Sequence, residues 1–238
     1  TASKKSRKNA KLMCTALRAL FRYARHQGFL TTQLDAAVPS VANWRLASIP
    51  YSLPAESVER ILSSCNRETG IGKRDYAIIL LLSRLGLRAG EIITLSLEDI
   101  DWRSGIITVH GKGSHRSQMP LPSDVGEAMA AYLQFGRPKS SSRKVFLRSQ
   151  APIRGFNRSG PITTLVNRAI KRSGITRAKS GAHQFRHSIA TNLLSGGASL
   201  SEIAELLRHR TIDCTTIYAK VDLPSLRTLA LPWPGGDK

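Results

Sequence analysis

A histidine and an arginine three residues apart form the most informative pair in this sequence. In the segment HQFRH, a helix would place His183 and Arg186 on the same face. An imidazole beside a guanidinium suits the negatively charged oxygens of a phosphodiester. The structural alternative for this pair is a buried histidine that bonds to the backbone, next to a solvated arginine.

His183 and His187 lie one helical turn apart, which is a spacing that can hold zinc. The glutamate of the HExxH motif is missing, however, and Arg186 would lie beside the metal. We therefore predict no metal site in this segment.

Two more segments offer a guanidinium and an ammonium group. Arg88 lies where a short helix is expected to begin, and the free N–H groups of a helix N-terminus attract anions. Glu91, one turn later, can hold this arginine, although a purely structural Arg–Glu pair explains both residues equally well. Lys112 lies between two glycines, where a mobile ammonium could act as a general acid. This tripeptide lacks the spacing of a nucleotide-binding loop, so we predict no nucleotide cofactor.

The last candidate residues are His209 and Tyr218, near the C-terminal end. A phenol can attack a phosphate if nearby cations favour the phenolate or if a base removes its proton. For a single tyrosine, packing with a satisfied hydroxyl is the usual explanation. Tyr218 therefore gains importance only together with the arginines and histidines.

The charge of the chain indicates a polyanionic partner. Its 238 residues carry a formal net charge of +20, and the basic residues recur along the whole sequence. A membrane-surface protein would concentrate them on one amphipathic helix, so nucleic acid is favoured, with a basic ribosomal scaffold protein as the alternative. For any single arginine, a solvated surface is the simpler explanation. As DNA contacts we predict Lys4, Lys5, Lys8, Lys11, Arg18, Arg22, Arg116 and Arg208.

The remaining composition predicts a cytoplasmic protein without a membrane partner. The three cysteines, Cys14, Cys65 and Cys214, form no CxxC pair, so neither a disulfide framework nor a cysteine zinc site is indicated. The longest apolar run, residues 76–82, is too short to span a bilayer, and no signal peptide opens the chain.

The hydrophobic pattern predicts a mainly α-helical protein with a small antiparallel β-sheet, an α+β fold. Prolines between residues 34 and 53 indicate a linker, which divides the chain into residues 1–50 and 51–238. We expect strands around 106–109 and 118–121, and an isolated strand at 144–148. Helices are expected before residue 28, from residue 54, and at 73–85, 88–95, 123–135, 161–173, 183–194, 200–208 and 212–220.

Taken in order, these residues resemble one family. Arg88, Lys112, His183, Arg186, His209 and Tyr218 lie within GLRAGEI, HGKGSHRSQMPLP, HQFRHSIATNLLSGG and LLRHRTIDCTTIYAKV. This set closely resembles the tyrosine recombinase, or phage integrase, family from about residue 51 to the C-terminus. The resemblance implies that family's catalytic-domain fold, preceded by a short, partial helical core-binding segment. It also implies a site-specific recombinase or integrase that works through a 3′-phosphotyrosine intermediate and a Holliday junction.

The resemblance further assigns a role to each residue. Tyr218 would be the nucleophile, and Arg88 and Arg186 would clamp the non-bridging phosphate oxygens. His183 and His209 would donate hydrogen bonds and assist proton transfer. Lys112 would protonate the leaving 5′-oxygen, and Glu91 would support the site. One phosphate ester replaces another, so no cofactor is required.

The resemblance also predicts partners and has two local departures. We expect a double-stranded recombination site and a homotetramer on DNA, in which the apolar tail after Tyr218 docks on a neighbour. A tail that folds back on its own domain, with a monomeric free protein, is the alternative. Arg208 stands where the family commonly has glycine, and residues 219–220 are Ala-Lys where Thr-His is frequent. Competing functions are a type IB topoisomerase, a non-catalytic DNA-binding protein derived from a recombinase, and a basic RNA-binding protein.

Overall fold

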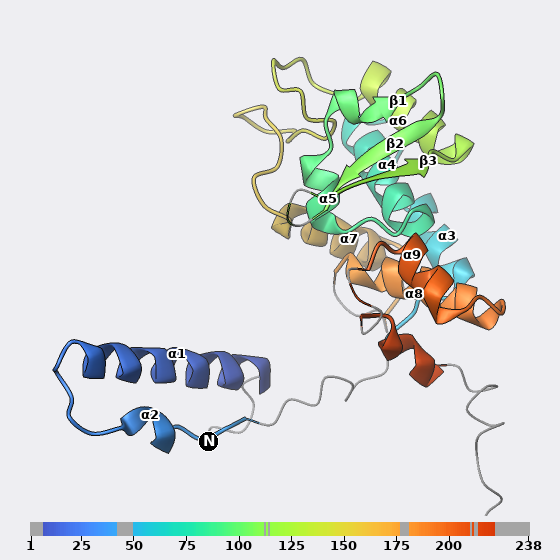
Figure 1. The fold of residues 1–238 in the computed structure, drawn as a ribbon. Coiled ribbons are helices and arrows are strands. Elements are labelled where there is room, and N and C mark those ends of the chain that lie inside the picture. Colours follow the sequence, from blue (N-terminus) through green and yellow to red (C-terminus); the bar gives the residue numbers. More distant parts are fainter. Residues whose placement is uncertain are drawn as a thin grey trace, which may run out of the picture. The chain divides into compact units, whose positions relative to one another are not determined.

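The computed structural model describes residues 7–41, 50–111, 113, 115–176, 181–209, 211 and 214–221. The described residues before position 49 and those after it form two separate compact units. The second unit is mainly helical and contains one small antiparallel sheet (Figure 1), which confirms the predicted fold class. None of the described helices combines the length and the apolar content that crossing a membrane requires.

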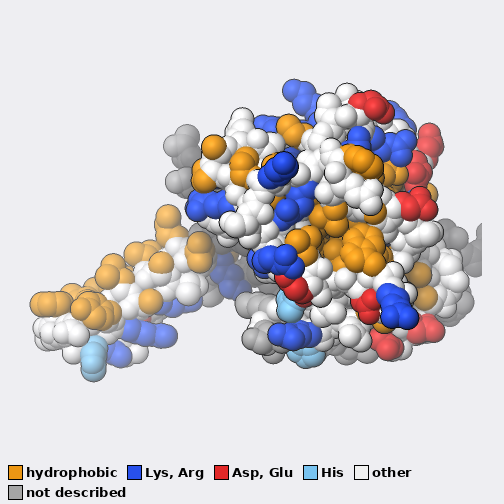
Figure 2. Space-filling model, turned by 90° about the horizontal axis from the view of Figure 1, so that it is seen from above, with side chains coloured by type: hydrophobic (Ala, Val, Ile, Leu, Met, Phe, Trp, Pro, Cys, Tyr) orange, Lys and Arg blue, Asp and Glu red, His pale blue; other side chains and the backbone are white. Residues whose placement is uncertain are grey.

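The first unit consists of α1 (Arg7–His26) and a short helix α2 (Leu34–Ala37). The prediction of a linker from residue 34 was wrong at its start, because Asp35 in α2 accepts a hydrogen bond from Arg22 Nε of α1 at 3.0 Å. This ion pair fixes a helical turn that proline spacing alone does not reveal. Figure 2 shows hydrophobic side chains along this unit, and several of them, including Leu12 and Leu20, are exposed.

The helices of the second unit follow the predicted pattern closely. They are α3 (Ala55–Ser63), α4 (Gly70–Arg84), α5 (Ala89–Thr94), the 3-10 helix η1 (Leu97–Asp99), α6 (Ser123–Phe135), α7 (Gly160–Arg172), α8 (His183–Ser195), α9 (Leu200–Leu206) and the 3-10 helix η3 (Thr216–Val221). The α-helix predicted over 212–220 was wrong in type, since its described part is 3-10 helix. Consecutive β-branched residues, Thr215, Thr216 and Ile217, disfavour a regular α-helix there.

The sheet has the order β1–β2–β3, with all neighbours antiparallel. Its strands are β1 (Ile100–Asp101), β2 (Ile106–His110) and β3 (Arg116–Pro120). Ile107 pairs with Met119, and both side chains point into the core. The isolated strand predicted at 144–148 was wrong: Lys144 bridges to Ser96 and residue 147 to residue 155, so the segment makes single bridges to two different partners.

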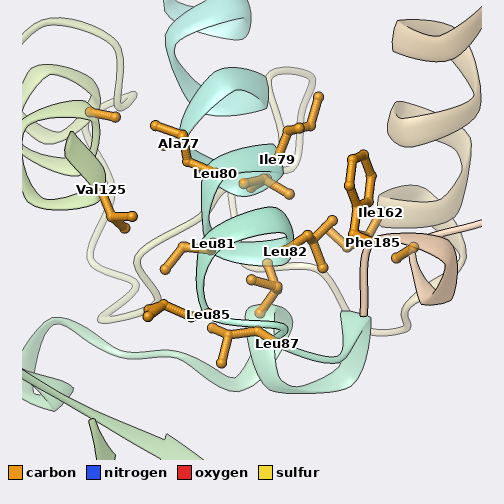
Figure 3. Close-up of a cluster of buried hydrophobic side chains, with 14 of the residues drawn as sticks. Ala77, Ile79, Leu80, Leu81, Leu82, Leu85, Leu87, Val125, Ile162 and Phe185 are labelled. Atoms are coloured by element: carbon orange, nitrogen blue, oxygen red, sulfur yellow. The ribbon is translucent and has the colours of Figure 1, made fainter. Parts of the chain in front are cut away.

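Helix α4 forms the centre of the core. Its residues from Ala77 to Leu82 are all buried, as expected of a helix that is apolar on every side. Side chains from α6, α7 and α8 surround it, including Val125, Ile162 and Phe185 (Figure 3). Gly86 then takes a left-handed conformation with φ +60°, which turns the chain out of α4 toward α5.

A buried serine links the start of the second unit to α8. Ser188 Oγ accepts a hydrogen bond from the Leu53 N–H at 2.6 Å and donates one to the Gln184 carbonyl at 2.8 Å. Ser188→Ala would leave the Leu53 N–H buried without its partner, so we expect the free energy of unfolding to fall by about 1–3 kcal/mol. Urea denaturation measures this change. Ser83→Ala is the matched control, because the described hydrogen bond of this serine stays within its own helix. An equal loss in both variants would contradict the prediction.

Candidate active site

Arg88 is positioned by the N-terminus of α5, as predicted. It is the residue that precedes the helix, and its backbone N–H donates to Glu91 Oε2 at 2.8 Å. The other carboxylate oxygen, Oε1, accepts a hydrogen bond from Arg88 Nη1 at 2.7 Å. The Glu91 side chain is only 4% exposed, whereas that of Arg88 is 36% exposed. The buried Glu91 carboxylate therefore fixes the position of the Arg88 guanidinium, which stays accessible to solvent and to a ligand.

Arg186 in α8 is held by backbone carbonyls instead of a carboxylate. Its Nη1 donates to the Gly86 carbonyl at 2.6 Å, and its Nη2 donates to the Leu207 carbonyl. Burial, together with the nearby guanidiniums of Arg88 and Arg208, lowers the pKa of Arg186 to about 10. The group is still charged at neutral pH. Its hydrogen bonds join the loop before α5 to the end of α9, so one side chain connects three parts of the site.

The two predicted histidines lie in the same cationic surroundings. Burial lowers the pKa of His209 to about 4, and the guanidiniums of Arg186 and Arg88 contribute to this shift. The pKa of His183 is also lowered, by burial first and then by the same two arginines. His209 Nδ1 makes a 2.7 Å hydrogen bond with Thr215 Oγ1, which orients the ring. Both imidazoles are therefore neutral at pH 7 in the protein without DNA.

Tyr218 in η3 is buried beside these groups. Its ring lies parallel to that of His209, with the ring centroids 6.5 Å apart, and its hydroxyl is 2.9 Å from His187 Nδ1. Burial raises the pKa of Tyr218, although Arg186 and Arg88 lower it. The sequence analysis correctly expected nearby cations to lower the pKa of this phenol. It did not foresee that burial raises the pKa by more than the arginines lower it, so the phenol of the free protein stays protonated.

His187 lies in the site, although the sequence analysis gives it no part beyond the rejected zinc spacing with His183. Instead, its ring meets the Tyr218 ring edge to face at 5.6 Å between centroids, in addition to the hydrogen bond. Its position directly after Arg186 and one turn after His183 was the available signal.

A cavity of about 570 Å³ opens between the sheet and these helices, and its lining includes Arg88, Glu91, Gly111, Arg208 and His209. Arg208 Nη2 contacts Glu91 Oε2 at 3.2 Å, so one carboxylate is shared by two guanidiniums. The backbone of Arg208 has φ +53°, the left-handed region that glycine adopts without strain. A glycine, which the family resemblance leads one to expect here, would adopt this conformation without strain, whereas the arginine adds a third guanidinium to the site.

Four of the predicted site residues cannot be placed because they lie outside the described part of the chain. They are Lys4, Lys5, Lys112 and the side chain of Lys8. Lys112 is preceded by Gly111, which lines the cavity, and Gly111 N–H donates to the His115 carbonyl at 2.7 Å in the turn between β2 and β3.

The basic residues expected to contact DNA differ in their described surroundings. Lys11 and Arg116 are exposed. Arg18 donates to the Val38 carbonyl at 2.8 Å, and Arg22 pairs with Asp35 at 3.0 Å, so both have partners within the first unit. For all of these residues, DNA contact stays a prediction.

The low pKa of His209 predicts a pH dependence of stability. An unfolded histidine titrates near 6.5, but the folded site resists protonation until about pH 4. Between these values the unfolded state binds more protons, so the free energy of unfolding should fall as the pH is lowered from 6.5 toward 4. Urea denaturation at several pH values measures the slope. His209→Gln removes this contribution, and an unchanged slope in that variant would contradict the prediction.

The chain is similar to known proteins over most of its length. The model of the phage integrase family matches residues 52–223. The protein y4rA of Sinorhizobium fredii, whose name assigns it to the integrases or recombinases, is 55% identical over 98% of this chain and 57% of its own length. The tyrosine recombinase XerD of Listeria innocua is 32% identical over 91% of this chain and 73% of its own length.

Among solved structures, the XerH site-specific recombinase in a pre-cleavage complex with its difH substrate has a TM-score of 0.70 at 24% identity. The match covers 90% of this chain and 62% of that one, and at this identity it shows a shared fold. The chain spans 57% and 52% of the lengths of two Sinorhizobium fredii relatives, y4rA and y4rF.

Proposed function

This chain belongs to the phage integrase family of tyrosine recombinases, and we propose that it cuts and rejoins DNA at a specific site through a 3′-phosphotyrosine bond at Tyr218. The observation that supports this most is that distant segments bring these side chains together. Arg186 donates to the Gly86 carbonyl, two residues before Arg88, and to the Leu207 carbonyl, two residues before His209. The His209 ring lies parallel to that of Tyr218. Two guanidiniums near a phenol suit attack on a phosphodiester, because they can neutralise the charge on its oxygens.

The proposed chemistry follows from the residue types. Guanidinium forks match the non-bridging oxygens of a phosphate and neutralise the charge that they carry in the transition state. Arg88, held by Glu91, and Arg186 take this role. His183 and His209 are neutral and can donate hydrogen bonds to the same oxygens. Lys112, which follows the cavity-lining Gly111 in the sequence, supplies the proton for the leaving 5′-oxygen.

The reaction replaces one phosphate ester with another of similar energy, so the chemistry calls for no high-energy cofactor. Tyr218 Oη forms a bond to phosphorus while the bond from phosphorus to the 5′-oxygen breaks. A 5′-hydroxyl of a second strand then attacks the phosphotyrosine and restores the DNA backbone. Exchange between two sites in this way passes through a Holliday junction.

The proposed partner is double-stranded DNA carrying a recombination site, bound by a homotetramer. The net charge of +20 supports a polyanionic partner, and the XerH structure is that of a complex with its difH substrate. Phosphate contacts should make the affinity fall steeply with salt. Residues 222–238, most of the apolar tail through which neighbours are expected to dock, lie beyond the described residues. The division into a core-binding segment, 1–50, and a catalytic domain, 51–238, is part of the same proposal.

A covalent trapping experiment tests the proposed function and identifies the target sequence at the same time. A pool of nicked duplexes with a random central sequence is incubated with the protein. DNA that survives denaturing washes as a covalent adduct is amplified and sequenced. We expect enrichment of one inverted-repeat motif, because each strand is cut by one subunit of a symmetric assembly.

Other outcomes would contradict the proposal in distinct ways. Adducts without sequence enrichment, together with relaxation of supercoiled plasmid by the protein alone, would indicate a type IB topoisomerase. Retarded DNA on native gels without any covalent adduct would indicate a non-catalytic binding protein. Stronger retention of RNA than of duplex DNA would indicate an RNA-binding protein.

A further inference from the structure

The hydroxyl of the proposed nucleophile makes its described hydrogen bond with a histidine outside the set to which the family resemblance assigned roles. His187 Nδ1 lies 2.9 Å from Tyr218 Oη, and the two rings meet edge to face. Helix α8 packs against η3, which brings the two residues together across 31 positions of sequence. His187 therefore touches the atom that must lose a proton before it can attack phosphorus.

The other two histidines of the site are placed differently. His209 faces the Tyr218 ring in a parallel arrangement, and its Nδ1 is engaged by Thr215 Oγ1 at 2.7 Å. His183 lies one helical turn before His187, and its pKa is lowered by burial first and then by Arg186 and Arg88. Among the described hydrogen bonds, neither of these two rings is a partner of Tyr218 Oη.

The buried phenol needs a proton acceptor. Burial raises the pKa of Tyr218 in spite of the two arginines, so the phenolate is not available in the free protein at neutral pH. A neutral imidazole with its proton on Nε2 can accept from a hydroxyl at Nδ1 and has a basicity suited to general-base catalysis.

We propose that His187 is the general base for Tyr218, an inference that rests on the proposed strand-transfer function. In cleavage, the proton of Tyr218 Oη moves to His187 Nδ1 as Oη bonds to phosphorus. The bond to the 5′-oxygen breaks, and that oxygen takes a proton from Lys112. In rejoining, the oxygen of the 5′-hydroxyl bonds to phosphorus and its proton goes to Lys112. The bond between phosphorus and Oη breaks at the same time, and His187 returns its proton to Oη. Cleavage followed by rejoining leaves both residues in their original states.

His187→Asn is the main test variant, because the asparagine amide can keep a hydrogen bond to the phenol but cannot take up its proton. Single-turnover cleavage is measured on a nicked duplex that carries the enriched site, so that the covalent adduct accumulates. The rate should fall by about 10²-fold or more, which is the usual contribution of a general base. DNA affinity and the urea unfolding midpoint are measured in parallel, and His187→Gln serves as a second variant if the asparagine protein does not fold.

A substrate with sulfur in place of the bridging 5′-oxygen separates the two proton transfers. The thiolate leaves without a proton, so Lys112→Ala should recover on this substrate whereas His187→Asn should not. Replacing Tyr218 with 3,5-difluorotyrosine, a more acidic phenol, should reduce the difference in cleavage rate between the proteins with His187 and with His187→Asn. A merely structural role would leave that difference unchanged.

The outcomes distinguish this inference from the proposed function. If the wild-type protein forms no adduct, the proposed function fails. If it does, and His187→Asn cleaves at a rate within about threefold of wild type, well short of a general base's contribution, His187 is not the base. If His187→Asn regains its cleavage rate on the sulfur substrate, His187 acts at the leaving group. If the difference in rate between wild type and His187→Asn is unchanged with difluorotyrosine, the role of His187 is structural. Each of these results overturns the inference while leaving the proposed function intact.

Discussion

Tyr218→Phe is expected to abolish the covalent protein–DNA adduct, with a loss of at least about 10⁴-fold in single-turnover cleavage, as removal of other enzymatic nucleophiles shows. The variant removes only the Oη atom. The ring keeps its place between His187 and His209, so the fold and the DNA affinity should change little. Denaturing gels measure the adduct, and native gels measure binding of the same duplex.

Tyr132→Phe is the matched control for this prediction. Tyr132 is also buried, and its hydroxyl accepts a hydrogen bond from the Leu147 N–H at 3.2 Å, away from the site. Loss of that bond should lower the free energy of unfolding by about 1–3 kcal/mol but leave adduct formation in place. An adduct of normal yield in Tyr218→Phe would assign the nucleophile to another residue.

Arg186→Lys is expected to reduce both cleavage and stability. A lysine ammonium cannot reproduce the planar fork that reaches the Gly86 and Leu207 carbonyls together. Leaving one buried carbonyl without its charged donor should lower the free energy of unfolding by about 1–3 kcal/mol. The cleavage rate should fall by about 10²- to 10³-fold, as for removal of one donor to a transition-state oxygen.

Arg88→Lys also replaces a guanidinium with an ammonium, but here we expect a smaller loss of stability than in Arg186→Lys. The Arg88 side chain is 36% exposed, and Glu91 would keep its contact with Arg208. Stability should therefore change by less than about 1 kcal/mol, while cleavage falls by a factor similar to that in Arg186→Lys. Urea denaturation and single-turnover rates separate the two variants. Equal losses of stability would show that the carbonyl contacts of Arg186 do not hold the site together.

The local pattern of the sequence was sufficient for most helices of the second unit. An apolar run such as that of α4 specifies a buried helix whatever its neighbours are, and Gly86 marks its end. The spacing of His183 and Arg186 likewise specifies a shared helix face. Local patterns were misleading where a contact with a distant segment decides the structure, as for α2, which the pair between Arg22 and Asp35 holds in place.

What only the tertiary structure decided is the environment of each reactive group. Arg208 shares the carboxylate of Glu91 across 117 positions of sequence, and Arg186 reaches Gly86 across 100. The burial that raises the pKa of Tyr218 and the hydrogen bond between its hydroxyl and His187 also arise only when α8 and η3 pack together. The physical reason is that residue type and spacing determine which groups are available, whereas desolvation and hydrogen-bond partners depend on neighbours that are remote in the chain and near in space.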